Sequence, residues 1–363
     1  MKVGIIGSGQ LGWMMIIEGR KLQNSYYVLD DKPGPAARLA DSYIPVSEYK
    51  KFVDACDIVT FEFEHVSEQA LLYAEKKDKL RPGIDSVSLK RDRAAEKEFL
   101  SANGIPVAEY SISDSREDAL KSARAFGKAV IKSSRGGYDG KGQFYYNALG
   151  KGGKIRLPAG ERFVVEEFID FDFEASVIAS RGEDGTKRFH IPSFNRNVGG
   201  ILFFNEAPFR DYGMRDVASK ILDALEYVGV MGVEFFIRGG RCIVNEIAPR
   251  VHNTGHHTLH GSSISQFEQH LRTITGLPVP EPLLYKPSGI VNAVGVEITR
   301  EKEERLMRIP ETHSYPYGKG ELRRRRKMGH VNVNAHTVRE LRERRRRVIE
   351  ILYGSEPEAY FLP

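Results

Sequence analysis

A glycine-rich segment near the middle of the chain has the residue types that bind phosphate. Residues 135–143, with the sequence RGGYDGKGQ, follow the apolar run Ala129–Ile131. Such a segment does not suit a helix or an ordinary strand, because glycine loses the most backbone entropy on ordering. Closely spaced bare N–H groups form a cradle for anions, and Lys132 and Lys141 add positive charge. A phosphate group is therefore the expected ligand.

Tyr138 and Asp139 within this segment are not needed to grip phosphate. A phenol and a carboxylate at that place indicate a lid that holds ATP and also touches a second substrate. A flexible surface hairpin is the alternative interpretation, because Gly-Gly and Asp-Gly are also turn signals.

Two glutamates in apolar surroundings indicate a metal site. Glu234 and Glu246 lie in two predicted neighbouring strands, 232–237 and 242–247. A bare carboxylate is costly to bury in such a strand. Oxygen ligands that share Mg²⁺ with the phosphates of ATP would offset that cost. Salt bridges to nearby Arg or Lys side chains are the alternative.

The segment that follows the second strand is dense in polar groups. Residues 245–257 have the sequence NEIAPRVHNTGHH. Arg250 can bind a carboxylate or phosphate through two parallel hydrogen bonds, and His252 can transfer protons near neutral pH. The absence of a nearby cysteine and the irregular spacing argue against zinc. His256 and His257 are expected to be structural.

Two further signals are weaker when taken alone. Residues 166–169, at the end of a predicted strand, could present backbone groups to an adenine edge, and Glu174 could bind ribose hydroxyls. An ordinary strand and turn is the alternative. Lys319 and Arg326 belong to a basic segment that could clamp a phosphate, although charge runs are more often solvated faces.

The first residues offer a different possibility. Residues 7–12, GSGQLG, follow a predicted strand and open a helix, and Asp30 and Asp31 follow the next strand. This arrangement is typical of dinucleotide-binding turns, so an NAD-dependent oxidoreductase is an alternative function. A helix N-terminus also binds a plain phosphate group, and we rank that interpretation higher.

The elements that position these residues fall into three parts. Residues 1–92 alternate short apolar strands with helices, which predicts a doubly wound, Rossmann-like domain with a parallel sheet. Residues 93–277 show strands joined by turns, which is typical of antiparallel sheets. Four prolines between residues 278 and 287 mark a boundary, and residues 278–363 form a small β-rich unit closed by a helix over 337–352.

Composition is that of a soluble globular protein, with 41% hydrophobic and 28% charged residues in a chain of 363. No apolar run is long enough to cross a bilayer, and a strand-like segment directly after Met1 predicts no signal peptide. Cys56 and Cys242 lie in apolar segments, which fits reduced thiols and a cytoplasmic location.

The net charge of +5 comes from the last 63 residues, chiefly from the arginine runs at 323–326 and 344–347. A nucleic-acid-binding module is therefore another alternative, although few aromatic side chains stand near either run to stack on bases. The second run is expected to be a solvated helix face paired with Glu340, Glu343 and Glu350.

Four segments together resemble the N5-carboxyaminoimidazole ribonucleotide synthetases of the ATP-grasp superfamily. They are residues 137–143 (GYDGKGQ), 245–255, 265–268 (SQFE) and 327–330 (KMGH), and the resemblance runs nearly end to end in the same order. It implies a multidomain α/β and α+β protein with an ATP-grasp fold. It also implies an ATP-grasp carbon–nitrogen ligase, in which ATP, bicarbonate and 5-aminoimidazole ribonucleotide give ADP, phosphate and N5-carboxyaminoimidazole ribonucleotide.

The resemblance also implies roles for individual residues. Contacts to ATP are expected from Arg93, Lys132, Gly137, Tyr138, Asp139, Gly140, Lys141, Gly142, Gln143, Glu166, Glu167, Phe168, Ile169, Glu174, Asn245 and Glu246. Glu234 and Glu246 would hold Mg²⁺ or Mn²⁺. Bicarbonate and the aminoimidazole would lie among Tyr138, Asp139, Lys141, Arg250, His252 and Asn253. Lys319 and Arg326 would grip the ribonucleotide phosphate, and relatives suggest a homodimer that binds neither nucleic acid nor membranes.

Three departures from the family pattern stand out. Trp13 follows the Gly-Gln-Leu-Gly turn, where relatives often have arginine. Some relatives have a histidine that contacts ATP near the position of Asn195, and this chain has none there. Arg324 and Arg325 replace the usual Pro-Gly of the basic motif. Another ATP-grasp ligase, of the formate-dependent glycinamide ribonucleotide transformylase type, is the nearest alternative, and the Tyr-Asp pair in the glycine segment argues against it.

Overall fold

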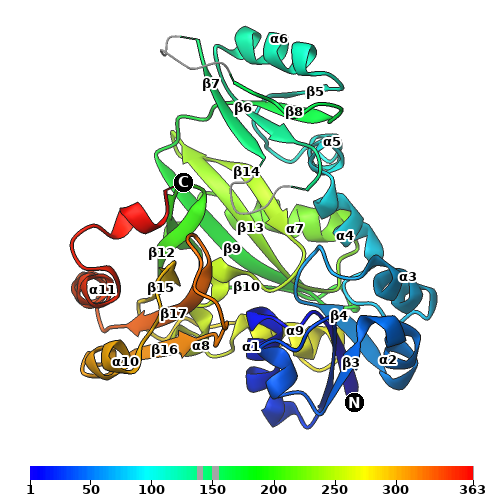
Figure 1. Ribbon diagram of the computed structural model, residues 1–363, viewed down its shortest axis with the longest axis vertical. Coiled ribbons are helices and arrows are strands. Elements are labelled where there is room, and N and C mark those ends of the chain that lie inside the picture. The colour runs from blue at the N-terminus through cyan, green and yellow to red at the C-terminus, as the bar shows by residue number, and fades with distance from the viewer. Residues whose placement is uncertain (137–141, 149–154, 363) are drawn as a thin grey trace.

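Three β-sheets organise the molecule (Figure 1). The computed structural model describes residues 1–136, 142–148 and 155–362. Within that part of the chain, no helix combines the length and the apolar character needed to span a membrane.

The first sheet is parallel, as the alternating pattern of residues 1–92 predicts. Its order is β3-β2-β1-β4, and every pairing is parallel. The side chains of α1 pack on one face, whereas those of α2 and α3 pack on the other, which makes the domain doubly wound. Its elements are β1 (Lys2–Ile6), α1 (Gln10–Gly19), β2 (Ser25–Asp30), β3 (Ser42–Pro45), α2 (Tyr49–Ala55), β4 (Ile58–Phe61) and α3 (Glu68–Lys76).

Two consecutive helices, α4 (Ile84–Arg91) and α5 (Arg93–Ala102), lead out of this domain. Asp92 separates them and caps α5, because its carboxylate accepts hydrogen bonds from the backbone N–H groups of Ala94 and Ala95. The same carboxylate accepts from Ser134 Oγ at 2.6 Å. This cap therefore joins the helix pair to the strand that precedes the glycine segment.

The second sheet is antiparallel, with the order β5-β8-β6-β7. Helix α6 covers one face, and its alanines pack against Ile131, Phe163 and Val165 of the sheet. The glycine segment connects β6 to β7, and its residues 137–141 lie outside the described part of the chain. The elements are β5 (Tyr110–Ser113), α6 (Arg116–Phe126), β6 (Lys128–Ser133), β7 (Gln143–Asn147) and β8 (Phe163–Glu167).

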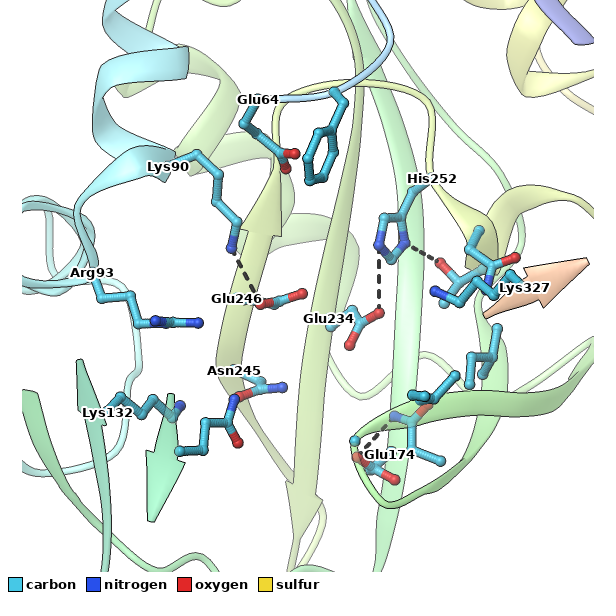
Figure 2. Close-up of a pocket in the computed structure, with 18 of the residues that line it drawn as sticks. Glu64, Lys90, Arg93, Lys132, Glu174, Glu234, Asn245, Glu246, His252 and Lys327 are labelled. Carbon is cyan, nitrogen blue, oxygen red and sulfur yellow. Dashed lines mark hydrogen bonds and ion pairs between the residues drawn. The ribbon is translucent and has the colours of Figure 1, made fainter. Parts of the chain in front are cut away.

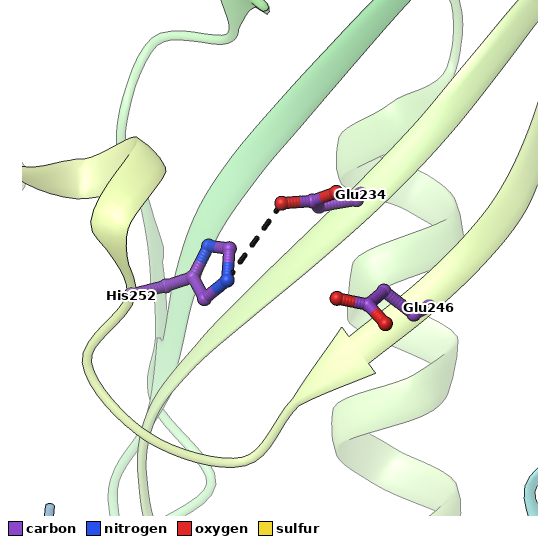
Figure 3. A group of neighbouring side chains, drawn as sticks. All are labelled: Glu234, Glu246 and His252. Atoms are coloured by element: carbon purple, nitrogen blue, oxygen red, sulfur yellow. Dashed lines mark ion pairs between the residues drawn. The ribbon is translucent and has the colours of Figure 1, made fainter. Parts of the chain in front are cut away.

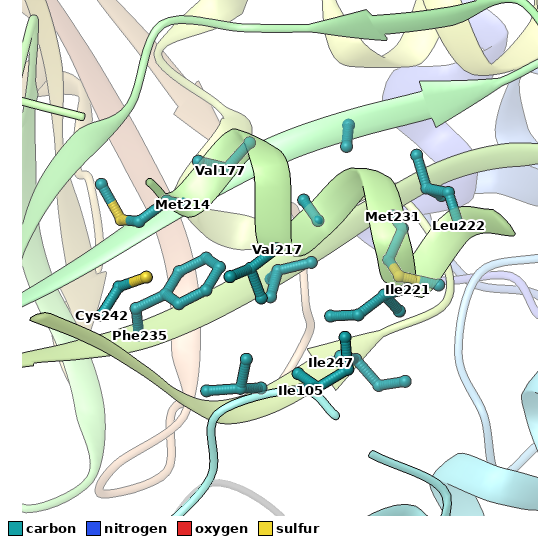
Figure 4. Packing of buried hydrophobic residues seen from close by; sticks show 14 of the residues in the cluster. Ile105, Val177, Met214, Val217, Ile221, Leu222, Met231, Phe235, Cys242 and Ile247 are labelled. Atoms are coloured by element: carbon teal, nitrogen blue, oxygen red, sulfur yellow. The ribbon is translucent and has the colours of Figure 1, made fainter. Parts of the chain in front are cut away.

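The third sheet has nine strands in the order β14-β13-β9-β11-β12-β15-β17-β16, with β10 paired to β9. Helix α7 buries Val217, Ile221 and Leu222 against β9, β13 and β14 (Figure 4). The elements up to residue 277 are β9 (Phe173–Arg181), β10 (Lys187–Phe189), β11 (Ser193–Val198), β12 (Ile201–Ala207), α7 (Met214–Ala224), β13 (Gly229–Arg238), β14 (Arg241–Ala248), α8 (Thr258–Gly261) and α9 (Gln266–Ile274).

The strands that follow the proline-rich boundary continue this same sheet, because β15 pairs with β12. The C-terminal residues thus form no sheet of their own within the described chain, although they share a core with the end of β11 and with β12. The elements are β15 (Ser288–Val294), α10 (Arg300–Met307), β16 (Thr312–Pro316), β17 (Lys327–Asn334) and α11 (Val338–Tyr353).

The expectation that the second arginine run is a solvated face is wrong for two of its members. The side chain of Arg344 is 11% exposed and pairs with Glu340. Arg345 is 16% exposed, pairs with Glu206 of β12, and lies 3.9 Å from the centre of the Phe204 ring. Arg344 also donates to the carbonyl of Asn334 in β17 at 2.6 Å, so both arginines fasten α11 to the large sheet.

Candidate active site

One cavity of about 940 Å³ lies where the three sheets meet (Figure 2). Its wall includes most of the residues selected from the sequence, although these lie up to 233 positions apart along the chain. Gly142 is described but is not part of the wall. The selected residues that line the cavity are Arg93, Lys132, Gln143, Glu166, Glu167, Phe168, Ile169, Glu174, Glu234, Asn245, Glu246, Arg250, His252, Asn253, Lys319 and Arg326.

Five selected residues cannot be placed. Gly137, Tyr138, Asp139, Gly140 and Lys141 lie outside the described residues. Gly136, directly before this stretch, and Gln143, two residues beyond it, line the cavity.

Two carboxylates and an imidazole meet on the floor of the cavity (Figure 3). Glu234 of β13 and Glu246 of β14 are direct partners in the antiparallel register. His252 follows β14, and ligand atoms of the three side chains lie within 4.8 Å of one another. Burial, together with the neighbouring Glu246 carboxylate, raises the pKa of Glu234 above its usual range. The arrangement would hold a hard divalent cation, since two oxygen ligands already face the same point.

Lys90, at the end of α4, contacts this cluster and was not selected from the sequence. Its ammonium group lies 3.2 Å from Glu246 and 3.4 Å from Glu96. Burial alone would raise the pKa of Glu246, but the charge and hydrogen bond of Lys90, together with other cationic groups nearby, outweigh burial and hold that pKa below its usual range. Part of the salt-bridge alternative is therefore correct, because Glu246 has a cationic partner as well as a place in the carboxylate cluster.

A buried ion triad joins α5, β6 and β8 at the wall of the cavity. The Glu166 carboxylate lies 2.7 Å from Lys132 and 3.0 Å from Lys97. Burial would raise the pKa of Glu166, but the two ammonium groups lower it to about 2. Lys97 was not selected, because one lysine in a charged helix resembles any solvated residue. The side chain of Glu166 thus holds both lysines in place.

Aromatic rings line the side of the cavity next to the strand end at 166–169. Phe171 stacks on Phe236 with ring centres 4.7 Å apart, and Tyr145 meets Phe168 edge-on at 6.5 Å. Glu174 accepts a hydrogen bond of 3.0 Å from the Asn197 amide. Burial raises the pKa of Glu174. A planar base with an attached sugar matches this combination of apolar faces and a carboxylate.

Arg250 is held in place by a residue far away in the sequence, and His252 by a residue two positions further along the chain. Arg250 lies 3.0 Å from the buried Glu64 carboxylate, which follows β4 of the first domain. His252 Nδ1 lies 2.9 Å from Thr254 Oγ1. Burial, and then the Arg250 charge, lower the pKa of His252 to about 3, so the ring is neutral at pH 7.

Asn253 gives the most direct sign of a missing ligand. Both polar atoms of its side-chain amide are buried, and neither has a hydrogen-bond partner among the described residues. A buried amide without partners is costly, because it has lost its contacts with water and gained nothing in return. Its position in the cavity wall therefore indicates a polar ligand.

The far end of the cavity is basic. It is lined by Lys319 and residues 323–326 of the loop between β16 and β17, and by Lys327 at the start of β17. The Lys319 ammonium group donates to the Lys327 carbonyl at 3.0 Å, and Arg326 donates to the Glu321 carbonyl at 2.8 Å. All four arginines of the first run thus line the cavity.

The glycine turn at residues 7–12 borders the same end, but carboxylates of the chain occupy its donors. Glu62 accepts from the backbone N–H groups of Gly9 and, at 2.9 Å, Gly12. Asp30 accepts from the N–H of Ser8 at 2.7 Å. A dinucleotide pyrophosphate would need these same donors. The geometry therefore argues against the NAD alternative.

Models of three families match the chain in succession. They describe a ribonucleotide synthetase preATP-grasp domain over residues 1–90, an ATP-grasp domain over 98–267 and a phosphoribosylaminoimidazole carboxylase C-terminal domain over 288–344.

Relatives match over nearly their whole length. The N5-carboxyaminoimidazole ribonucleotide synthase of Saccharolobus solfataricus is 44% identical, over 97% of this chain and 96% of its own. The crystal structure of a phosphoribosylaminoimidazole carboxylase ATPase subunit from Aquifex aeolicus is 38% identical and covers 97% of this chain and 100% of its own, with a TM-score of 0.84. A synthase from Aspergillus clavatus in complex with ADP and 5-aminoimidazole ribonucleotide is 27% identical, with coverages of 97% and 98% and a TM-score of 0.85.

The three domain models match in the order in which the parts of the fold follow one another along the chain. The relatives are similar to the chain over nearly its whole length, including the segments that line the cavity. They confirm the resemblance inferred from the four sequence segments. The chain belongs to the N5-carboxyaminoimidazole ribonucleotide synthase family of ATP-grasp enzymes.

Proposed function

We propose that the cavity between the three sheets is where this ligase carries out the reaction of its family. That reaction uses ATP to carboxylate 5-aminoimidazole ribonucleotide with bicarbonate, in de novo purine biosynthesis. The observation that carries the assignment is the shared wall: the Glu234–Glu246 cluster, the Lys132 triad, the partnerless Asn253 amide and the basic loop all face one space.

ATP would lie with its base between the aromatic wall and the strand end at 166–169, and with its phosphates toward Lys132 and Arg93. Glu174 would take the ribose. The glycine segment starts from the end of β6 that carries Lys132, which fits a role next to the phosphates. The assignment of ATP contacts to Asn245 and Gln143 rests on their positions in the same wall.

Glu234 and Glu246 would hold Mg²⁺, with His252 beside them. The donor set fits, because two buried carboxylates so close together repel each other unless a cation lies between them. When bound, the ion would neutralise charge on the ATP phosphates. Mn²⁺ suits the same ligands, and the imidazole of His252 would favour it more than Mg²⁺.

Bicarbonate is a poor electrophile and must first be activated. One of its oxygens attacks the γ-phosphorus of ATP, the bond from that phosphorus to the bridging oxygen breaks, and ADP leaves. The products are carboxyphosphate and ADP. The chain contributes chiefly position and charge, with Arg250 binding the carbonate oxygens and the Lys132 ammonium facing the phosphates.

The exocyclic amine of the ribonucleotide then attacks the carbonyl carbon of carboxyphosphate, or CO₂ released from it, and inorganic phosphate leaves. A base must take the proton of the amine. Asp139 and His252 are the two candidates for this base, and burial makes His252 a weak one, because it lowers the pKa of the ring to about 3. Lys319 and Arg326 would bind the ribonucleotide phosphate at the basic end of the cavity.

A phosphate-release assay tests the proposed function. Release from ATP should require bicarbonate together with 5-aminoimidazole ribonucleotide, and the carboxylated product should form in equal amount. Replacing bicarbonate with formate, and the ribonucleotide with glycinamide ribonucleotide, tests the nearest alternative ligase. Release that is supported only by the second pair would overturn the assignment.

Oligomeric state and location stay predictions. A homodimer is expected from the family resemblance, and sedimentation equilibrium at several concentrations would measure it. The buried thiols Cys56 and Cys242 fit a reducing cytoplasm.

A further inference from the structure

The loop between β16 and β17 is tied to two distant segments by a single side chain, that of Arg325. Its guanidinium group donates to the carbonyl of Phe361 at the C-terminal end, and to the carbonyl of Gly199 at 2.8 Å. Gly199 lies in the turn between β11 and β12, and the residues that follow it, Gly200 in the turn and 201–202 at the start of β12, line the cavity. One planar side chain thus joins the basic loop, the cavity wall and the C-terminal end.

The backbone at this residue supports a specific role for its side chain. Arg325 has a φ of +62°, in the left-handed region that favours glycine. The chain keeps an arginine at a position where glycine would be free of strain. The hydrogen bonds that its two amino groups make to the two carbonyls offset that cost.

The C-terminal partner is itself firmly anchored. The ring of Phe361 is fully buried, and its centre lies 4.8 Å from that of Phe203 and 5.8 Å from that of Tyr353. The C-terminal end accordingly lies beside β12 (Figure 1). We call the contact of Arg325 with the carbonyls of Gly199 and Phe361 the junction. Gly199 fits closely in it, because a Cβ there would lie 2.6 Å from the Phe361 oxygen and 3.1 Å from Arg325 Nη1.

The loop is also held at its other end. Arg38 of the first domain donates to the Gly318 carbonyl at 3.0 Å, next to Lys319. The backbone N–H of Gly295 donates to the Arg326 carbonyl at 2.8 Å. The two basic residues assigned to the substrate phosphate, Lys319 and Arg326, thus each adjoin a point at which the loop is fixed.

We infer that Arg325, together with the C-terminal segment around Phe361, positions the phosphate-binding loop and so sets the affinity for the ribonucleotide. The inference rests on the proposed function, in which Lys319 and Arg326 bind the substrate phosphate. Arg325 is a positioning residue here, because it acts through the loop and its two carbonyl partners.

Steady-state kinetics of two variants at residue 325 test the inference. Arg325→Gly removes the side chain and suits the left-handed backbone, and it should raise KM for the ribonucleotide about tenfold while KM for ATP changes less than twofold. Arg325→Lys keeps the charge but lacks the planar fork, so it should raise the same KM to a similar extent. Recovery of the wild-type KM in the lysine variant would overturn the inference, because charge alone would then explain the role.

Gly199→Ala tests the junction from its other side without changing any charge. It should reproduce the raised KM for the ribonucleotide, and hydrogen exchange at residues 319–327 should become faster in this variant and in Arg325→Gly. Arg346→Gly, which removes an exposed arginine from α11, is the matched control and should change neither measurement. Unchanged KM and exchange in both junction variants would overturn the inference.

Lys319→Ala separates this inference from the proposed function. If Lys319→Ala raises KM for the ribonucleotide but Arg325→Gly does not, the proposed site stands and the positioning role is wrong. If neither variant changes that KM, the phosphate assignment is wrong, and the positioning role falls with it.

Discussion

At the scale of single residues, Glu246 lies between a positive and a negative neighbour. It pairs with the Lys90 ammonium and also faces Glu234, whose pKa it helps to raise. A carboxylate with a fixed cationic partner stays ionised, which is the form that a divalent cation requires. Lys90 therefore favours the form of Glu246 that the proposed metal site needs, although it offers no ligand atom itself.

Glu246→Gln should lower kcat by two or more orders of magnitude while the fold survives, because the amide binds Mg²⁺ far more weakly than a carboxylate does. Turnover against Mg²⁺ concentration measures the effect, and circular dichroism checks the fold. Glu343→Gln, on the exposed side of α11, is the control. Near-normal turnover of Glu246→Gln would remove this residue from the metal site.

Lys319→Ala should chiefly raise KM for the ribonucleotide, by roughly ten- to a hundredfold, since one charged contact to phosphate contributes on the order of 1.5–3 kcal/mol. The KM for ATP should stay within twofold, because the basic loop lies at the other end of the cavity from the Lys132 triad. An effect confined to the KM for ATP would contradict the assignment.

At the scale of elements, the buried triad of Glu166, Lys97 and Lys132 joins α5 to the second sheet. The three side chains are 5%, 4% and 11% exposed, so neither ammonium group can turn to bulk water. Glu166→Gln would leave two buried positive charges without their partner. We expect the free energy of unfolding to fall by about 3–5 kcal/mol.

Urea unfolding of Glu166→Gln measures this loss, with Glu167→Gln as the matched control because the side chain of Glu167 is 37% exposed. The pH dependence has a definite sign. The pKa of Glu166 is lowered to about 2 in the folded state, so its contribution is complete above the unfolded value of about 4.3 and is lost as the pH falls toward 2. The difference in stability between wild type and Glu166→Gln should therefore shrink between pH 5 and pH 2.

Local patterns in the sequence predicted several helices and strands, and they also predicted that two carboxylates of the site lie side by side. Glu234 and Glu246 could be paired in advance because they lie on consecutive strands joined by a short turn. The parallel sheet of residues 1–92 followed from its alternating pattern. In contrast, β11 and β12 were not predicted, since Asn195, Asn197 and two glycines interrupt the apolar pattern.

The missed residues share a physical cause. Lys90 reaches Glu246 across 156 positions of the chain, and Glu64 and Lys97 likewise meet partners on other elements. Before the chain folds, each is a charged residue in a charged stretch. Their roles depend on which sheets come together, and local spacing carries no information about that.

At the scale of the whole molecule, one buried histidine joins the first domain to the large sheet. The backbone N–H of Val230 in β13 donates to His270 Nδ1 at 3.1 Å, so the proton of the ring lies on Nε2. That group then donates to Thr60 Oγ1 of β4, 2.9 Å away. Burial lowers the pKa of His270 to about 3, which keeps the ring neutral.

His270→Ala should therefore weaken the contact between these two parts of the molecule. It leaves a buried N–H and a buried hydroxyl without partners and opens a cavity, which together cost roughly 3 kcal/mol. Trp13, the only tryptophan, lies on α1 and meets Tyr315 and Tyr317 of the large-sheet region edge-on. Its fluorescence should report a lower urea midpoint in His270→Ala, whereas His336→Ala, at a side chain that is 76% exposed, should match wild type. An unchanged midpoint would mean that the two parts are held together without this hydrogen-bonded bridge.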